Sequence, residues 1–204
     1  MPGAKFMVGT QLAEETFQRC AERSADLERR TGRRPCLATV IVGNDPASET
    51  YIRMKHNRCK KSGITSRHAA LPASSTTADV VGVLRELSND PDVHGILLQH
   101  PVPHHVDERA AFEAIAPAKD VDGVTMDSFA RMAFGLPGFV SCTPGGILRL
   151  LKAYGVELQG KHAVVIGRSP ILGKPVGMLL LNENTTVTYC HSRTRNLEEI
   201  VSTL

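Results

Sequence analysis

Short apolar runs alternate with amphipathic helical segments along this chain, and this alternation strongly limits the folds it can adopt. The first run, "CLATVIV" (36–42), follows a helical segment at 11–30 that ends at Gly32, and the second, "HGILLQ" (94–99), follows a helical segment at 76–90. Strands that are apolar on both sides occur mainly in parallel sheets whose two faces are covered by helices. The sequence therefore predicts an α/β fold built on a parallel sheet.

Further helices are expected around these strands. One runs from about Ser48 to near Gly63, and another covers 107–116. Thr76 or Thr77 is the expected N-cap of the helix that precedes the second strand. A hydroxyl at that position can accept a hydrogen bond from an amide of the first turn, which has no partner within the helix.

A loop-rich segment at 134–146 separates two predicted domains, 1–142 and 143–204. The second begins with a helix at 146–155 and continues as one strand–helix–strand unit at 163–166, 172–183 and 185–190. It is shorter than the ~100–150 residues usual for a domain. We therefore expect the second domain to be truncated. An incomplete domain would bind a cofactor poorly and expose a sheet edge that favours aggregation.

The composition excludes several functional classes. The 204 residues carry a net charge of +3 without a long basic run, so binding to nucleic acid is not expected. Five scattered cysteines with no CxxC pattern favour a reducing compartment. No apolar stretch is long enough for a signal peptide or a membrane span. These features predict a cytoplasmic protein, or one from an organelle matrix if a transit peptide has been removed.

Two glycines at the end of the first strand of the second domain suggest a dinucleotide site. Gly167 ends this strand, Gly173 lies six residues later near the start of the helix, and Ser169 replaces the middle glycine of the usual fingerprint. Such glycines let a pyrophosphate approach the amides of the helix N-terminus. The pattern is degenerate, so a tight structural turn remains an alternative.

The residues that follow the next strand indicate which dinucleotide is bound. NAD-selective sites usually place a carboxylate there, on the ribose hydroxyls. This chain instead has Ser192 and Arg193, with Arg168 in the glycine loop. Guanidinium and hydroxyl groups suit a ribose 2′-phosphate. The sequence therefore predicts NADP.

Tyr51 and Lys55 stand four positions apart, which places both side chains on one face of a helix. A tyrosine and a lysine at this spacing also form the catalytic pair of short-chain dehydrogenases, but there the pair follows the cofactor loop, whereas here it precedes the loop. Gln99 ends the second strand, where open α/β sheets commonly bind ligands. Each of the three residues has an alternative, structural role: Tyr51 as a half-buried core ring, Lys55 as a solvated side chain on a helix face, and Gln99 as a partner in a loop hydrogen bond.

Six stretches, in this order, closely resemble the bifunctional methylenetetrahydrofolate dehydrogenase/methenyltetrahydrofolate cyclohydrolases. They are "VGNDPASETYIRMK", "GILLQHPVP", "PAKDVDGVT", "SCTPGGILRLL", "VVIGRSPILGKPVGMLLL" and "TTVTYCHSRTRNL", and the resemblance runs from about residue 36 to the end. It implies an N-terminal α/β catalytic domain followed by a Rossmann-type NADP-binding domain, and a homodimer. The implied reactions are oxidation of 5,10-methylenetetrahydrofolate with NADP and hydrolysis of the methenyl product to 10-formyltetrahydrofolate.

The resemblance also implies roles for single residues. Tyr51 would stack on the pterin, Lys55 would move protons in the hydrolytic step, and Gln99 would hydrogen-bond this lysine. The carboxylate of Asp122 would accept two hydrogen bonds from adjacent N–H groups on the amidine edge of the pterin, in a bidentate pairing. Asp120, two residues earlier, is expected to be structural.

Three histidines, His100, His104 and His105, lie within six residues, but no metal site is expected. Two prolines intervene, no carboxylate or thiol is matched to them, and the resembling family needs no metal here. That family commonly has an aliphatic residue at the position of His100, so the lip of the folate site is expected to differ. Two rival functions remain, a cyclohydrolase without dehydrogenase activity and a non-catalytic folate-binding or dimerisation module.

Overall fold

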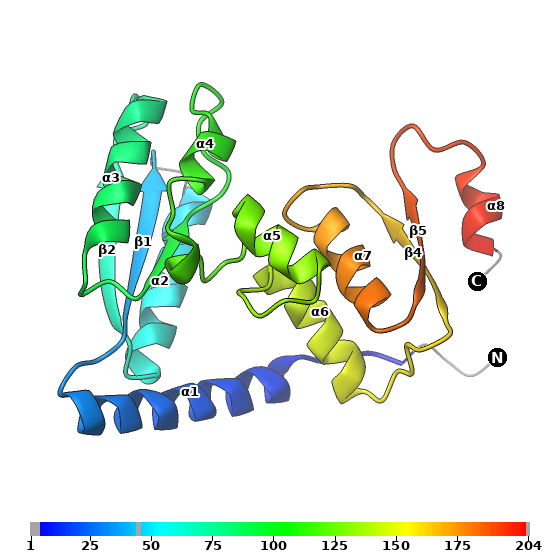
Figure 1. Ribbon diagram of the computed structural model, residues 1–204, viewed down its shortest axis with the longest axis horizontal. Helices are drawn as coiled ribbons and strands as arrows, with labels where there is room; N and C mark the ends of the chain where they lie inside the picture. Colours follow the sequence, from blue (N-terminus) through cyan, green and yellow to red (C-terminus); the bar gives the residue numbers. More distant parts are fainter. Residues whose placement is uncertain (1–4, 44–45, 203–204) are drawn as a thin grey trace. The chain divides into compact units, whose positions relative to one another are not determined.

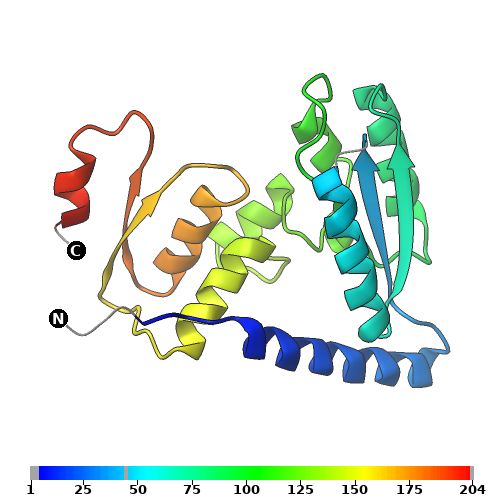
Figure 2. The ribbon, with the colours of Figure 1, turned by 180° about the vertical axis from the view of Figure 1, so that it is seen from behind.

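A computed structural model describes the backbone of residues 5–43 and 46–202, and the side chains of these residues outside 46–53. The chain forms two compact units (Figures 1 and 2). The first unit is Ala13–Val121, and the second contains the chain before Ala13 and from Asp122 onward. Each unit has its own parallel sheet. The predicted boundary between residues 142 and 143 stays a prediction.

The first unit is built on a three-stranded parallel sheet in the order β2-β1-β3. Its strands are β1 (Cys36–Val42), β2 (Thr65–Leu71) and β3 (Gly95–Leu98). β1 lies in the middle and is buried along almost its whole length, as its uninterrupted apolar sequence predicts. The parallel sheet predicted from the sequence is therefore confirmed, with the first apolar run at the predicted bounds.

Helices cover both faces of this sheet. α2 (Pro46–Lys61) connects β1 to β2 on one face, and α3 (Thr77–Asn89) connects β2 to β3 on the other (Figures 1 and 2). The two connections run across the sheet in opposite directions, so right-handed crossovers place their helices on opposite faces. The largest fully buried apolar side chains of the unit form its core: Val40, Val80, Leu84, Val93, Ile96, Leu98 and Phe112.

Three further helical segments complete this unit. α1 (Thr10–Thr31) leads into it and ends as predicted at Gly32, which has a φ of 69° and whose N–H donates to the C=O of Glu28. α4 (Glu108–Phe112) and the 3-10 helix η1 (Pro117–Lys119) follow β3.

Lys119 fixes the chain at the end of η1. Its ammonium donates to the C=O of Leu87 at 3.2 Å and to that of Asp90 at 2.6 Å, and so satisfies carbonyls at the C-terminus of α3. The backbone of the next residue, Asp120, forms a parallel bridge with Ile96 of β3, and the Asp120 side chain is fully buried. These contacts agree with the structural role expected for Asp120.

Thr76 is the N-cap of α3, which decides between the two predicted threonines. The Thr76 hydroxyl accepts from the N–H of Asp79, and the Asp79 carboxylate accepts from the hydroxyl and the N–H of Thr76, which completes a capping box. The hydrogen bond from the Thr76 hydroxyl, and to a smaller extent that from the Thr76 N–H, holds the pKa of the Asp79 carboxyl below its ordinary value.

This cap makes the stability of the first unit dependent on pH. A carboxyl with a lowered pKa in the folded state stabilises that state above its unfolded pKa of about 3.9, and this stabilisation is lost as the pH falls through the folded pKa. We expect Thr76→Ala to lower the free energy of unfolding by about 1 kcal/mol at neutral pH. The deficit should narrow below about pH 4. Urea titrations of both proteins at several pH values measure it, and a deficit independent of pH would contradict the prediction.

The second unit contains a two-stranded parallel sheet, β4 (His162–Ile166) and β5 (Thr186–Cys190), joined by α7 (Gly173–Asn182). This confirms the predicted strand–helix–strand unit. α6 (Cys142–Ala153), which begins four residues before the predicted helix, and α5 (Met126–Ala133) pack against α7. The short helix α8 (Leu197–Ser202) follows β5.

Three elements were not predicted from the sequence: β2, α5 and the 3-10 helix η1. β2 has the sequence "TSRHAAL" and leaves most of its side chains exposed or half-buried, because it lies at the edge of the sheet. α5 lies in the segment before the predicted boundary loop, and its first turn is capped by Thr125, whose hydroxyl accepts from the N–H of Ser128.

Candidate functional site

Lys55 and Gln99 meet at the carboxyl edge of the first sheet. Lys55 lies on α2 and is half-buried, and Gln99 directly follows β3. The Lys55 Nζ donates to the Gln99 Oε1 at 3.0 Å. The N–H of Gln99 donates to the C=O of Val40 at 2.8 Å, so the sheet pairing with β1 extends to Gln99 and fixes its backbone. The structure thus brings together two of the predicted site residues.

The side-chain amide of Gln99 is oriented by a second hydrogen bond. Its Nε2 donates to the C=O of His100 at 2.9 Å, which leaves Oε1 facing the ammonium of Lys55. An amide oxygen can only accept and an ammonium can only donate, so the two contacts agree with one assignment of the amide. Gln99 therefore holds Lys55 through a group that favours its protonated form.

Tyr51 lies on α2 one turn before Lys55. Its side chain is outside the described residues, so its predicted contact with the pterin stays a prediction. Helix geometry places residues four apart on one face, and that relation to Lys55 follows from the backbone of α2.

Asp122 is the residue at which the chain passes from the first unit into the second, and it is half-buried. Its C=O accepts from the N–H of Cys142 at 3.2 Å, which ties it to the start of α6. The next residue, Gly123, has a φ of 67°, and a Cβ there would lie 2.5 Å from the N of Ser141. Only glycine fits this turn, so the backbone beside Asp122 is held tightly. The predicted contact of Asp122 with substrate stays a prediction.

The glycine loop of the second unit has the features that a dinucleotide requires. Gly167 continues the sheet through its N–H, which donates to the C=O of Cys190 at 2.7 Å. Its φ of 139° favours glycine, and the position of a Cβ there is open space. At Gly173 a Cβ would lie 2.6 Å from the C and O of Gly167. The first glycine thus leaves the backbone accessible, and the second lets α7 begin directly against the strand end.

Ser169 closes this loop onto the helix. Its C=O accepts from the N–H of Lys174 at 3.0 Å, and its hydroxyl accepts from the N–H of Ile171 at 3.3 Å. The loop therefore has a defined conformation although Ser169 replaces the middle glycine of the fingerprint.

The two loops that carry the predicted phosphate-binding residues lie at one edge of the second sheet. β4 and β5 are parallel and in register, with Ile166 opposite Cys190, so the loops that follow them leave the sheet at the same edge. One loop carries Arg168, and the other carries Ser192 and Arg193, and all three are exposed. These three residues are cationic or hydroxylic and none is a carboxylate. The edge therefore fits the phosphorylated ribose of NADP better than the ribose of NAD.

The turn after β5 is held by its own hydrogen bonds. The N–H of His191 donates to the hydroxyl of Thr194 at 2.7 Å, and the N–H of Thr194 donates to the C=O of His191 at 2.8 Å. The N–H of Arg193 donates to the Nδ1 of the His191 ring at 3.2 Å. The backbone that presents Ser192 and Arg193 is therefore ordered by local contacts.

The histidine-rich turn after β3 is engaged in contacts with protein groups. The Nδ1 of His100 lies 2.5 Å from the Oε1 of Glu108, and the Nε2 of His105 lies 3.0 Å from the C=O of Ser75. Within the part of the chain that the structure describes, no three His, Cys, Asp or Glu side chains gather as a metal site would require. Among the same residues, no helix has the length and apolar character needed to span a membrane. Sequence reasoning gave no role to Glu108.

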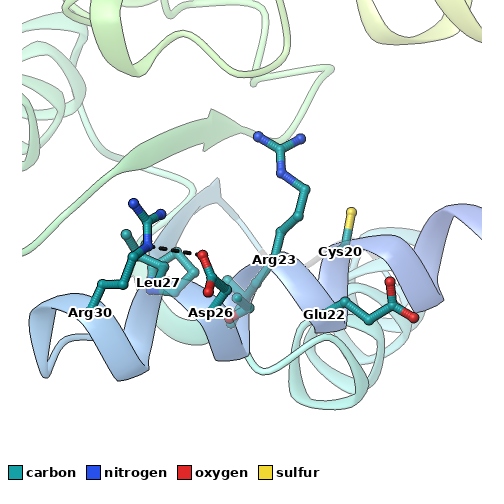
Figure 3. Close-up of a pocket in the computed structure, with 9 residues that line it drawn as sticks. Cys20, Glu22, Arg23, Asp26, Leu27 and Arg30 are labelled. Carbon is teal, nitrogen blue, oxygen red and sulfur yellow. Dashed lines mark ion pairs between the residues drawn. The ribbon is translucent and has the colours of Figure 1, made fainter.

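Two open pockets lie at the opposite edge of the first sheet. One, of about 520 Å³, lies between α1 and the residues that precede β1 and β2, Pro35 and Ile64 (Figure 3). Beside it, Arg30 forms an ion pair with Asp26 at 2.9 Å. The amino ends of parallel strands are the edge away from Gln99, so this pocket does not contain the predicted catalytic pair.

The second pocket, of about 460 Å³, lies at the same edge and is lined by three arginines, Arg33, Arg34 and Arg67. Each guanidinium forms an ion pair with a carboxylate: Arg33 with Asp92, Arg34 with Glu28 and Arg67 with Asp90. These carboxylates neutralise the positive charge of the three arginines, so the pocket offers no net positive charge to attract an anionic ligand.

Comparisons with known proteins identify the family. The family model of the tetrahydrofolate dehydrogenase/cyclohydrolase catalytic domain matches residues 7–122, and that of the corresponding NAD(P)-binding domain matches residues 141–203. The chain belongs to the tetrahydrofolate dehydrogenase/cyclohydrolase family. This confirms the resemblance, and it confirms the predicted fold of a catalytic α/β domain followed by a cofactor-binding domain.

Individual members of the tetrahydrofolate dehydrogenase/cyclohydrolase family are closely similar over almost the whole chain. The bifunctional protein FolD 1 of Streptomyces avermitilis is 67% identical over 97% of this chain and 69% of its own length. The bifunctional protein FolD 1 of Salinispora arenicola is 61% identical over 95% of this chain and 70% of its own. The chain thus spans about 70% of the length of these relatives.

Solved structures of family members share the fold. The methylenetetrahydrofolate dehydrogenase-cyclohydrolase of Trypanosoma brucei, solved with NADP and an inhibitor, aligns with a TM-score of 0.92 at 36% identity. The alignment covers 99% of this chain and 69% of that one. The bifunctional enzyme of Campylobacter jejuni aligns with a TM-score of 0.92 at 37% identity, over 96% of this chain and 69% of that one.

Proposed function

We propose that this protein is a bifunctional folate enzyme. It oxidises 5,10-methylenetetrahydrofolate to the 5,10-methenyl form with NADP, and it hydrolyses the methenyl form to 10-formyltetrahydrofolate. The observation that carries the proposal is the hydrogen bond between Lys55 and Gln99 at the carboxyl edge of the sheet, within the segment that matches the catalytic domain of the family. The names of the similar bifunctional proteins support both activities.

Lys55 is the proton carrier of the hydrolytic step in this proposal. Its neutral amine takes a proton from water as the water oxygen bonds to the bridge carbon of the methenyl cation. The resulting ammonium then gives this proton to the ring nitrogen N5 while the bond from carbon to N5 breaks. The hydroxyl proton of the adduct leaves to solvent, so one proton is released for each formyl group formed.

Lys55 adopts its amine form only in an environment that favours the loss of its proton. The bound substrate provides part of this environment. The positive charge of the bound methenyl bridge disfavours a second positive charge beside it. Gln99 acts in the opposite direction, because its Oε1 accepts from the ammonium at 3.0 Å. We propose that these two influences together keep Lys55 able both to accept and to return a proton during one turnover.

Substrate binding is assigned to Tyr51 and Asp122. Tyr51 stacks on the flat pterin, and the carboxylate of Asp122 accepts two hydrogen bonds from the amidine edge of the same ring. Family membership supports these roles. Titration of Tyr51→Ala and Asp122→Asn with a folate ligand tests them directly, since both variants should weaken binding.

The second unit holds the cofactor in this proposal. The open backbone at Gly167, the close start of α7 at Gly173 and the hydroxyl of Ser169 receive the pyrophosphate, and the edge with Arg168, Ser192 and Arg193 receives the 2′-phosphate. NADP supplies the acceptor for the hydride of the methylene bridge. The protein mainly orients the reactants, since the nitrogens of the product stabilise its cation.

NADP preference can be tested at Arg168. A charge-assisted hydrogen bond to phosphate contributes ~1.5–3 kcal/mol, which corresponds to about a tenfold to hundredfold change in affinity. We expect Arg168→Ala to weaken NADP binding by a factor in this range and to leave NAD binding unchanged, so the preference narrows. Calorimetric titration of both cofactors measures it. Equal affinity of the unmutated protein for NADP and NAD would contradict the assignment.

Two absorbance signals test the function as a whole. Appearance of NADPH reports the oxidation, and decay of the methenyl chromophore reports the hydrolysis. Decay without NADPH would identify a cyclohydrolase alone, and folate binding with neither signal would identify a non-catalytic module. We also propose that the protein is a cytoplasmic homodimer with no nucleic-acid or membrane partner. Light scattering measures the mass in solution.

A further inference from the structure

The side chain of His100 joins the catalytic edge of the first unit to helix α4. Its Nδ1 lies 2.5 Å from the Oε1 of Glu108, and the side chains of His100 and Glu108 are 45% and 30% exposed. An ionised carboxylate can only accept, so the ring nitrogen carries the hydrogen. The same Oε1 accepts from the N–H of Val102 at 3.4 Å. One carboxylate thus holds the turn that follows Gln99 at two points.

Glu108 is a firm anchor for this turn because the start of α4 is itself fixed. Asp107 caps the helix by accepting from the N–H of Ala110 at 3.0 Å. The N–H of Asp107 donates to the hydroxyl of Thr77 at 2.9 Å, which ties α4 to the start of α3. At the other end of α4, the side chain of Phe112 is 2% exposed and belongs to the core.

The other end of the connection reaches the catalytic lysine. The C=O of His100 accepts from the Nε2 of Gln99 at 2.9 Å, and the Oε1 of Gln99 accepts from Lys55 at 3.0 Å. The ring of His100 is bound to Glu108, so the position of its carbonyl, and with it the orientation of the Gln99 amide, depends on that contact. The contacts form a continuous chain from α4 to the Nζ of Lys55.

We propose that His100 and Glu108 form a clamp that positions Gln99 against Lys55 for the hydrolytic step. Both are positioning residues, because they act on Lys55 through the amide of Gln99. A half-exposed contact between two polar side chains contributes little to folding. The clamp therefore acts on geometry, and geometry strongly affects rates when a reacting group must be held in place. The inference rests on the proposed cyclohydrolase activity.

Steady-state kinetics of methenyl hydrolysis test the clamp. His100→Leu and Glu108→Ala should each lower kcat by about tenfold and change KM by less than about twofold. The double variant should be no slower than the slower single variant, because either change already opens the clamp. His100→Asn should recover most of the rate, since its amide N–H can donate to Glu108. His104→Leu, the same kind of change at an exposed residue of the same turn, should leave kcat unchanged.

Amide exchange tests the clamp without turnover. Exchange in the segment 100–107, measured by mass spectrometry, should become at least about tenfold faster in Glu108→Ala, because the Val102 N–H loses its acceptor and the turn loses its contact with the His100 ring. Unchanged exchange, or an unchanged kcat in an active enzyme, would overturn the clamp and leave the proposed function standing. A raised KM with normal kcat would make His100 a substrate contact and also overturn it. Absence of hydrolysis by the unmutated protein would overturn the proposed function and the clamp's role together.

Discussion

Replacing Lys55 by methionine is expected to lower the rate of methenyl hydrolysis by a factor of about 10²–10⁴, the usual contribution of a positioned acid–base group. Methionine keeps an unbranched stem of similar length beside Gln99 but has no nitrogen that can carry a proton. Folate binding should weaken only modestly, because Tyr51 and Asp122 carry it in the proposed site. Decay of the methenyl chromophore at saturating substrate measures the rate, and a separate titration measures binding.

Two further variants separate the proton-carrying role of Lys55 from its charge. Lys55→Arg keeps a positive group that can donate to Gln99, but a guanidinium does not lose its proton in proteins, so hydrolysis should be as slow as in Lys55→Met. Lys60→Met is the matched control on α2, since Lys60 is exposed in the last turn of the same helix. Near-normal hydrolysis by Lys55→Met would show that another group moves the proton.

The central strand of the first sheet could be predicted from the sequence because burial on both faces leaves a distinctive pattern. β1 needs apolar residues on both sides, and the run 36–42 supplies them without interruption. β2 lies at the edge, with Arg67 and His68 exposed, and its sequence resembles a loop. Its strand conformation follows from pairing with β1, a tertiary contact that no local pattern contains.

Helix α5 was missed for a related reason. It has eight residues and is followed by glycine and proline, so it offers little more than two turns of periodicity. Its position is fixed by contacts made across the unit, for example the hydrogen bond from the Nδ2 of Asn182 on α7 to the C=O of Met132 at 2.8 Å. A short helix of this kind is stabilised by packing more than by propensity.

The candidate site shows the same division between local and distant information. The sequence motifs, through their resemblance to the family, predicted Lys55 and Gln99 as site residues. The structure shows a hydrogen bond between these two residues. Glu108 could not be found in this way. Its contact with His100 crosses an irregular turn interrupted by prolines, where neither helical nor strand periodicity applies. Only the path of the turn brings the two side chains together.

Replacing Gly173 by alanine is expected to have the largest effect on the second unit. An added Cβ would lie 2.6 Å from the C and O of Gly167 and 2.8 Å from the N of Arg168. These are backbone atoms, so no side-chain rotation can make room, and α7 must move away from the end of β4. Overpacking of this kind costs ~1–3 kcal/mol. That exceeds the gain of less than about 1 kcal/mol from replacing glycine at the first position of a helix.

The same displacement should damage the cofactor site, because the approach of α7 to Gly167 is what brings its N-terminal amides to the glycine loop. We expect Gly173→Ala to lower NADP affinity at least about tenfold and to lower the free energy of unfolding by ~1–2 kcal/mol. Gly145→Ala is the matched control in α6, since its Cβ would meet a Val140 methyl at 3.5 Å, an ordinary contact. Calorimetric titration with NADP and denaturant unfolding of the three proteins measure both effects. Unchanged NADP affinity in Gly173→Ala would mean that the cofactor does not approach the protein through this loop.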